Sequence, residues 1–200
     1  NHFKTLDSDY GVVFSDAYLV DEFKNLKGTF YKRSNDGKLM ENVAQGNVFE
    51  TVVHSYKICS PTIMVRKAVF DELGGYDELL SYEDYDFFIR SSRNYKYHFI
   101  DQPLIYKREI KSSASSAFYK KKNNLHLAST LIVTKKALWL CKTDAEKKAL
   151  LHAVRYHYRQ SYFLDNFKLA LKYSELIMEM GYYTTGDRII ELLSRKEISA

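Results

Sequence analysis

The stretch GGYDELLSYEDYDFFIR, residues 74–90, decides how the first half of the chain is interpreted. It carries five carboxylates: Asp77, Glu78, Glu83, Asp84 and Asp86. Tyr85, Phe88 and Ile89 fall at positions i, i+3 and i+4, so the spacing predicts a helix that begins near residue 82 and buries that face. The acidic pair Glu83-Asp84 therefore lies where the backbone turns toward a core.

Two interpretations of this acidic pair stay open. Ser81 precedes Asp84 by three residues, which is the spacing of a capping box with Asp in place of Glu or Gln. Glu83 would then complement the positive end of the helix dipole. Alternatively, the helix start presents one carboxylate into a cleft as a general base. The two roles are compatible, because a helix start is a rigid mount for a short side chain.

The rest of the first half alternates extended segments with short helices. Asn35-Asp36-Gly37 is typical of a hairpin turn, and Gly74 is a favoured residue for ending a helix. In chain order, the patterns predict a strand over 10–20, a hairpin over 28–40, a helix over 46–56, a buried strand over 59–67, a short helix over 67–75 and two extended pieces over 96–109 that are broken at Pro103.

From about residue 116 the apolar period changes to 3.6. Apolar faces recur over 150–161 and 169–180, Gly181 ends the second of these helices, and TGDRIIELLSR supplies one more. We therefore expect three or four packed helices, with a boundary near residue 115 that separates 1–115 from 116–200.

Composition and charge bound the class of protein. The chain has 200 residues, 46% hydrophobic and 28% charged, which is typical of a globular protein. No apolar run approaches 18 residues, so no membrane span is predicted. Cys59 and Cys141 stand far apart without companion ligands and are predicted to be free thiols in a reducing, cytoplasmic compartment. The chain starts without Met, which favours an excised piece of a longer protein.

The net charge of +5 is unevenly distributed, and residues 116–172 hold 12 Lys and Arg against 3 Asp and Glu. The lysines of YKKK and TKK are typical of a solvated helix face. Attraction to an anionic membrane surface or a lipid-phosphate substrate also fits. No module for nucleic-acid binding is present. His152 and His157, on an aromatic helix, are predicted to be core or surface residues rather than ligands.

Asp7-Ser8-Asp9 is similar to the metal-binding Asp-x-Asp string of some sugar-nucleotide enzymes. That string follows a buried strand, whereas here the apolar strand comes after it and NHFKTL precedes it. We therefore predict no metal role for Asp7 and Asp9.

A longer stretch resembles a known family. SPTIMVRKAVFDELGGYDELLSYEDYDFFIRSSRNYKYHFIDQPLIYKREIKSSASS (60–116) combines a strand ending in Arg, a Gly-Gly-aromatic-Asp turn, an acidic "ED" helix with a downstream Arg, and an ID-x-P-L-x-Y strand. Together these motifs resemble the second half of the family 2 glycosyltransferases, which have the GT-A fold. The likeness runs from about DYGVVFSDAYL to Ser115.

The resemblance implies an inverting transfer of a sugar from a nucleotide diphosphate to an acceptor hydroxyl. It places the base on Asp84 and an acceptor contact on Glu83. Arg90 and Arg108 are candidates for the donor or diphosphate side, and Lys107 and Lys111 are further cationic candidates. A divalent metal, Mg or Mn, is expected in the full-length enzyme and none in this chain.

Two departures from the family pattern matter. The family's nucleotide-binding half, with its own Asp-x-Asp, precedes the segment that matches here, so residues 1–115 are expected to be an acceptor-side half. Such a half should not bind sugar nucleotides alone and should self-associate through its uncovered surface. In addition, Ile110 stands where the family loop has His.

The resulting prediction is a mixed α/β half of a GT-A transferase followed by an all-α helical appendage. Its partners would be a nucleotide sugar and a glycan acceptor, in the synthesis of a bacterial cell-surface polysaccharide or a lipid-linked glycan precursor, at or near the cytoplasmic membrane face. The rival prediction is a non-catalytic helical interaction module in which the ED pair only caps a helix. Asp77→Asn and Asp86→Asn are expected to be neutral unless either side chain is buried.

Overall fold

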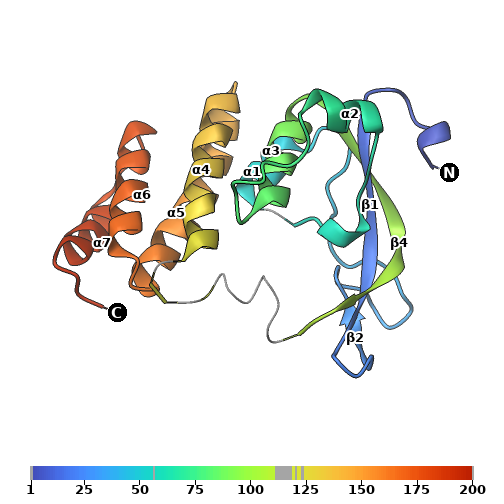
Figure 1. Ribbon diagram of the computed structural model, residues 1–200, viewed down its shortest axis with the longest axis horizontal. Coiled ribbons are helices and arrows are strands. Elements are labelled where there is room, and N and C mark those ends of the chain that lie inside the picture. Colours follow the sequence, from blue (N-terminus) through green and yellow to red (C-terminus); the bar gives the residue numbers. More distant parts are fainter. Residues whose placement is uncertain (1, 56, 111–118, 120, 123, 200) are drawn as a thin grey trace. The chain divides into compact units, whose positions relative to one another are not determined.

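The computed structural model describes residues 2–55, 57–110, 119, 121–122 and 124–199 (Figure 1). The predicted boundary near residue 115, together with Lys111 and Lys120, lies outside the described residues. The strands and helices, in chain order, are a 3-10 turn (His2–Lys4), β1 (Tyr10–Val20), β2 (Leu26–Thr29), α1 (Phe49–His54), a second 3-10 turn (Ser60–Thr62), β3 (Met64–Val65), α2 (Lys67–Glu72), α3 (Glu83–Asn94), β4 (Lys96–Arg108), α4 (Leu125–Leu140), α5 (Asp144–Phe163), α6 (Phe167–Glu179) and α7 (Thr185–Arg195).

The chain divides into two compact units, each built from separate stretches of sequence. The first, called the sheet unit here, comprises Asn1–Phe49, Lys57–Gly75 and Arg90–Ser113. The second, called the helical unit, comprises Glu50–Tyr56, Tyr76–Ile89 and Ala114–Ala200. Within the acidic segment, defined as residues 74–90, the part 76–89 that carries all five carboxylates therefore belongs to the same unit as the later helices.

In the sheet unit, β1 is the central strand of a mixed four-stranded sheet (Figure 1). It pairs with β2 and β3 in antiparallel directions and with β4 in parallel. Most of β1 is buried, as expected of a strand with partners along both edges. Gly11 lies in this strand because a Cβ there would approach the Tyr95 Cβ to 2.8 Å.

Two predicted strands differ from the structure. The segment 96–109 is one strand rather than two pieces, because the pairing continues past Pro103 through register shifts around Asp16. Pro lacks an N–H, so a β-bulge is where a strand accommodates it. The strand expected over 59–67 shortens to Met64–Val65, because Ser60–Thr62 forms a 3-10 turn behind Cys59.

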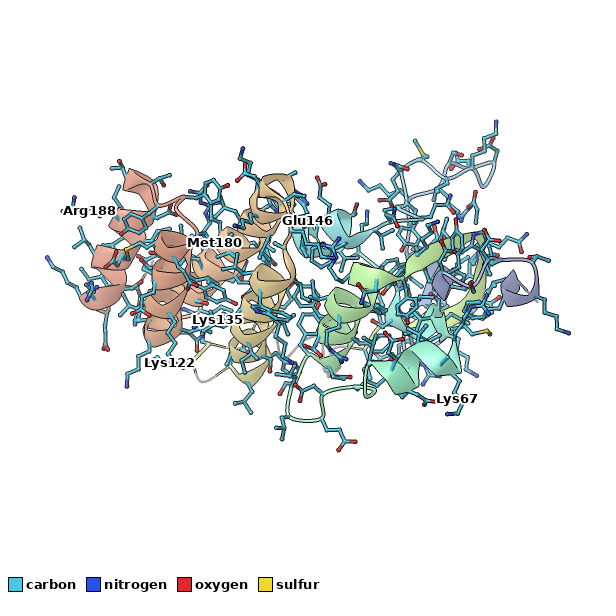
Figure 2. The ribbon with its side chains drawn as sticks, turned by 90° about the horizontal axis from the view of Figure 1, so that it is seen from above. Lys67, Lys122, Lys135, Glu146, Met180 and Arg188 are labelled. Carbon is cyan, nitrogen blue, oxygen red and sulfur yellow. The ribbon has the colours of Figure 1, made fainter. Side chains whose placement is uncertain are left out.

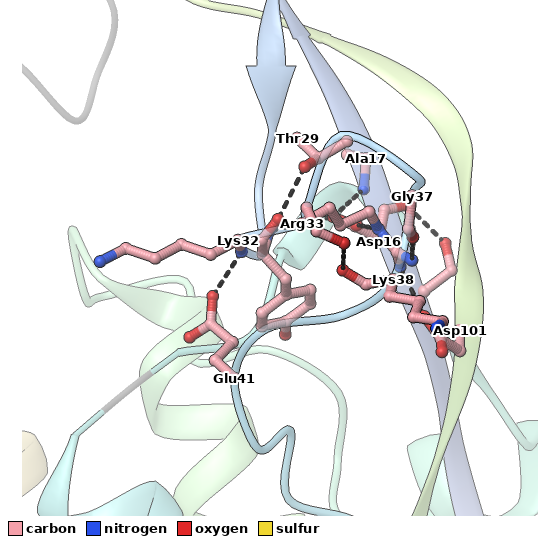
Figure 3. Close-up of polar contacts among 12 residues, drawn as sticks. Asp16, Ala17, Thr29, Lys32, Arg33, Gly37, Lys38, Glu41 and Asp101 are labelled. Atoms are coloured by element: carbon pink, nitrogen blue, oxygen red, sulfur yellow. Dashed lines mark hydrogen bonds and ion pairs between the residues drawn. The ribbon is translucent and has the colours of Figure 1, made fainter.

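The predicted hairpin turn at Asn35-Asp36-Gly37 is confirmed and is held by a buried acid. Arg33 and Leu39 form an antiparallel bridge across this turn. Asp16 is fully buried, and its carboxylate accepts hydrogen bonds from the Ala17 N–H at 2.8 Å and the Arg33 Nε at 2.7 Å (Figure 3). The Arg33 Nη2 also donates to Asp101 at 2.6 Å. This network fixes the loop after β2 against the sheet.

In the helical unit, the predicted helices over 150–161 and 169–180 are confirmed as parts of α5 and α6, and α7 is the predicted last one. α5 and α7 begin with capping boxes, in α5 between Thr143 and Glu146. Glu146 is labelled in Figure 2. Gly181 follows α6 with φ of 79°, as its role in ending that helix requires. The face of α5 that was predicted to be apolar is buried at Leu150, Ala153, Val154, His157, Tyr158 and Ser161.

Candidate functional site

The acidic segment begins at a two-glycine turn. Gly74 and Gly75 both have φ of 71°, a conformation that other residues rarely adopt. Within the sheet unit, the Arg90 guanidinium donates to the carbonyl oxygens of Leu73 at 2.7 Å and Gly75 at 2.8 Å. These contacts give Arg90 a structural task at the turn, and its predicted role on the donor side remains a prediction.

Lys136 of α4 holds the acidic segment within the helical unit. Its ammonium group lies 2.8 Å from Asp86 Oδ1 and 2.9 Å from Asp77 Oδ2. Burial opposes the charge on Lys136, but the hydrogen bonds that its ammonium group donates to Asp86 and Asp77 outweigh this effect and raise the pKa of the lysine. The Asp86 side chain is completely buried. Asp86→Asn was expected to be neutral unless Asp86 is buried. Because its side chain is buried, we no longer expect this substitution to be neutral.

Glu83 and Asp84, at the first turn of α3, border a cavity of about 610 Å³ in the helical unit. Ligand sites for small molecules are commonly of this size. The remaining residues that line the cavity are His54, Ser55, Ser81, Tyr82, Tyr85, Tyr119, His126, His152, Ala153, Tyr156 and His157. The two acids thus share one concave space with imidazole and phenol groups from α1, α4 and α5.

Asp84 and Ser81 have different partners at the start of α3, and the predicted capping box between them stays a prediction. Asp84 Oδ1 accepts a hydrogen bond from the Tyr85 N–H at 2.7 Å, a contact typical of a side chain at a helix start. The Ser81 N–H donates to the Ser129 Oγ of α4 at 3.0 Å. Asp84 is half-buried and Glu83 exposed. Asp84 thus lies in the first turn of α3 and borders the cavity.

The cavity carries an excess of negative charge. Burial and then the charge on Asp84 raise the pKa of Tyr82, and burial with the charges on Asp84 and Glu83 raises the pKa of Tyr76. Both phenols therefore stay protonated at neutral pH. Burial and the neighbouring His152 lower the pKa of His54, which favours its neutral form. Tyr82 and His54 therefore add no charge to that of the two carboxylates.

One wall of the cavity was not foreseen from the sequence. His152 and Tyr156 lie one turn apart on α5 and both line the cavity. His152 was predicted to be a core or surface residue, and its ring stacks on His54 of α1 at 4.1 Å between centroids. Because His54 and His152 are 98 residues apart in sequence, no local pattern could bring them together. The sequence did show that His152 and Tyr156 are four residues apart and so lie on one face of a helix, but it did not show what that face lines.

The other predicted site residues lie in the sheet unit. Arg108 ends β4 and is exposed, and Lys107 lies 5.2 Å from the centre of the Phe30 ring. The Asp9 carboxylate pairs with Lys96 at 2.6 Å. In the part of the chain that the structure describes, no three His, Cys, Asp or Glu side chains are grouped to hold a metal ion.

Comparison with known families identifies the class of protein. A model described as "Glycosyltransferase like family 2" matches residues 7–168. Searches of curated proteins and of solved structures give no match. Because the matched region covers most of the chain, the chain belongs to this family of glycosyltransferases.

Membership makes the protein a transferase whose substrates are a nucleotide sugar and an acceptor. The mixed α/β architecture is consistent with a GT-A-like domain. The match continues beyond residue 115 and so takes in α4 and α5. Among the helices described, none is long and apolar enough to cross a membrane.

Proposed function

We propose that the protein transfers a sugar with inversion at the anomeric carbon and that Asp84 is the general base. The observation that carries this proposal is the position of Asp84, which borders the 610 Å³ cavity beside Glu83. A half-buried carboxylate on a rigid helix start can accept a proton from a hydroxyl held in that cavity.

The chemical step is a single displacement. The acceptor oxygen forms a bond to the anomeric carbon, the bond from that carbon to the diphosphate oxygen breaks, and its electron pair leaves with the nucleoside diphosphate. The hydroxyl proton passes to the Asp84 carboxylate. Glu83, one residue earlier and exposed, contacts the acceptor in this proposal.

The metal implied by the family lacks a set of ligands in the described part of this chain. Asp9, the second acid of the Asp-Ser-Asp string, forms an ion pair with Lys96. A divalent metal bound elsewhere in the full-length enzyme, with a nucleotide-binding half that precedes this acceptor-side half, remains part of the proposal.

The rival interpretation, a non-catalytic helical module, is disfavoured by the family match and by the open space beside Asp84. If the protein were such a module, substitutions of Glu83 and Asp84 would change stability only. The Asp84→Asn experiment therefore separates the module from the transferase.

The experiment compares Asp84→Asn with wild type in the full-length protein, by following nucleoside diphosphate release with and without acceptor. Loss of the proton acceptor should lower transfer about 10²–10⁴-fold, while the melting temperature and donor affinity change little. Asp71→Asn is the matched control, because Asp71 is an exposed carboxylate on α2. Near-wild-type turnover in Asp84→Asn would place the base elsewhere.

The cellular setting is a further part of the proposal. We infer synthesis of a cell-surface polysaccharide or a lipid-linked precursor at the cytoplasmic membrane face. Leu125, Ile132 and Trp139 lie seven residues apart along α4 and are exposed, Trp139 at 85%. Lys135 and Lys142 are nearby in sequence (Figure 2). An exposed apolar stripe with lysines is typical of a surface that binds anionic lipid.

A further inference from the structure

Helices α4 and α5 contribute part of the cavity wall, in addition to the acids at the start of α3. His152 and Tyr156 come from α5, and His126 comes from α4. None of these residues belongs to the acidic motif that marks the family. What the cavity accepts therefore depends on helices that the motif does not describe.

The α5 wall is rigid. Its helix begins with a capping box, and Leu150, Val154 and Tyr158 on its other side are fully buried. The Tyr158 hydroxyl donates to the Asp187 carbonyl oxygen at 2.8 Å. These contacts fix the rotation of α5 about its axis, so the residues that face the cavity are held in place.

Tyr156 is an aromatic platform within the cavity. Its side chain is 42% exposed, and its ring meets the His157 ring edge-on at 5.3 Å between centroids. His157 is buried and backs onto Tyr173. The His54 and His152 rings, inclined by 10°, stack on each other and both line the cavity.

Flat aromatic surfaces beside carboxylates suit a sugar ring. A pyranose has an apolar face of C–H groups that packs on an aromatic ring, and hydroxyls that donate to carboxylate oxygens and exchange hydrogen bonds with phenols and imidazoles. The negative charge of Glu83 and Asp84 disfavours an acceptor that is a phosphate or a carboxylate, because like charges repel. A neutral sugar can pack on the aromatic rings and is not repelled by the two carboxylates.

We propose that the cavity binds the acceptor as an uncharged sugar ring, with Tyr156 and His152 of α5 as the residues that determine acceptor specificity. The proposal rests on the function proposed above and adds the chemical class of the acceptor and the residues that select it. The aromatic side chains position the ring, and its hydroxyl then faces Asp84.

The first test measures binding directly in the full-length protein. The probes are methyl β-glucoside, methyl β-galactoside and methyl N-acetyl-β-glucosaminide, with glucose 1-phosphate as the anionic comparison, followed by saturation-transfer NMR. We expect at least one neutral glycoside to bind and to bind more weakly to Tyr156→Ala by about 3- to 10-fold, the worth of one aromatic contact. Preferential binding of glucose 1-phosphate, or no glycoside binding, overturns the proposal.

The second test uses transfer kinetics with the glycoside that binds. Tyr156→Ala and His152→Ala should raise the acceptor KM and leave the donor KM unchanged, while Tyr156→Phe keeps most of the affinity. Phe163→Ala is the control, since Phe163 is an exposed aromatic on the same helix and does not line the cavity. An unchanged acceptor KM in folded Tyr156→Ala, checked by its melting temperature, overturns the role of α5.

Failure of this inference is distinguishable from failure of the proposed function. Asp84→Asn should keep glycoside binding and lose transfer. If Asp84→Asn keeps transfer while Tyr156→Ala weakens binding, the base is wrong and the sugar pocket stands. If the opposite holds, the base stands and the pocket wall is wrong.

Discussion

Asp84 and Asp86 lie two residues apart on one helix, and their surroundings differ in nearly every respect. Asp86 is completely buried and ion-paired with Lys136, whereas Asp84 is half-buried and borders the cavity. Two residues along an α-helix correspond to a rotation of about 200°. The same short acidic run therefore serves the interior on one face and an open space on the other.

The difference teaches how a charged segment can be both fixed and reactive. A buried carboxylate requires a partner, and Lys136 supplies one from α4 while also holding Asp77. That contact sets the rotation of the helix start. Asp84 then faces the cavity as a consequence of where Asp86 is held.

The largest effect on stability is expected from Lys136→Met. This variant removes a counter-charge from buried Asp86 and should lower the free energy of unfolding by about 3 kcal/mol, the lower end for buried pairs, because Lys136 is itself 36% exposed in its side chain. Urea denaturation measures the loss. Adding Asp86→Asn to Lys136→Met should restore part of the stability. A loss below about 0.5 kcal/mol would mean that the pair does not fix the helix.

The second prediction concerns the loss of stability at low pH that is caused by the buried His157. Burial lowers the pKa of His157 to about 4, below its unfolded value, so the unfolded chain binds more protons between the two values. This contribution is fully present above pH 6.5, falls as the pH drops toward 4, and amounts to at most about 3 kcal/mol. Melting temperatures across pH 4–7 check it.

The comparison variant for this pH effect is His157→Gln, which cannot take up the proton. Its stability should fall less between pH 6.5 and pH 4 than that of wild type, although its starting stability is lower. Equal slopes in the two proteins would show that other groups cause the acid loss.

The last prediction concerns binding to a lipid surface, where each single lysine should contribute least. If lysines attract the protein to anionic lipid, binding to vesicles containing phosphatidylserine should fall sharply as salt shortens the Debye length. Changing Lys120, Lys121 and Lys122 to Gln should weaken it further, by about 1 kcal/mol per lysine at low salt. Lys121 and Lys122 are exposed, and Lys120 lies outside the described residues. Equal binding to neutral and anionic vesicles would leave these lysines as a solvated surface.

Local patterns in the sequence predicted most of the elements. The 3.6-residue period marked α5 and α6, and the glycines at 74 and 181 marked helix ends, because these signals act within one or two turns of chain. The strand over 96–109 was divided wrongly, since proline argues against a strand locally and only pairing with β1 shows that β4 continues.

The candidate site was predictable only in part. Asp84 and Glu83 were identified through the family resemblance, and the structure places both at the cavity. Lys136 and the α5 wall were missed, because their partners are distant in sequence and a lysine or histidine on a helix is usually solvated. The role of Arg90 in holding the two-glycine turn also depended on contacts that no spacing predicts.

The ion pair between Lys136 and Asp86 also has a consequence for the order in which contacts form while the chain is being synthesised. The two residues are separated by 50 positions, so at the usual ribosomal rate of about 5–20 residues per second this contact becomes available several seconds after Asp86 is made. During that interval α3 has been synthesised, whereas α5, α6 and α7 have not. The contacts that hold the start of α3 within the helical unit, from Ser129 and Lys136, therefore form only after these parts of α4 have been synthesised.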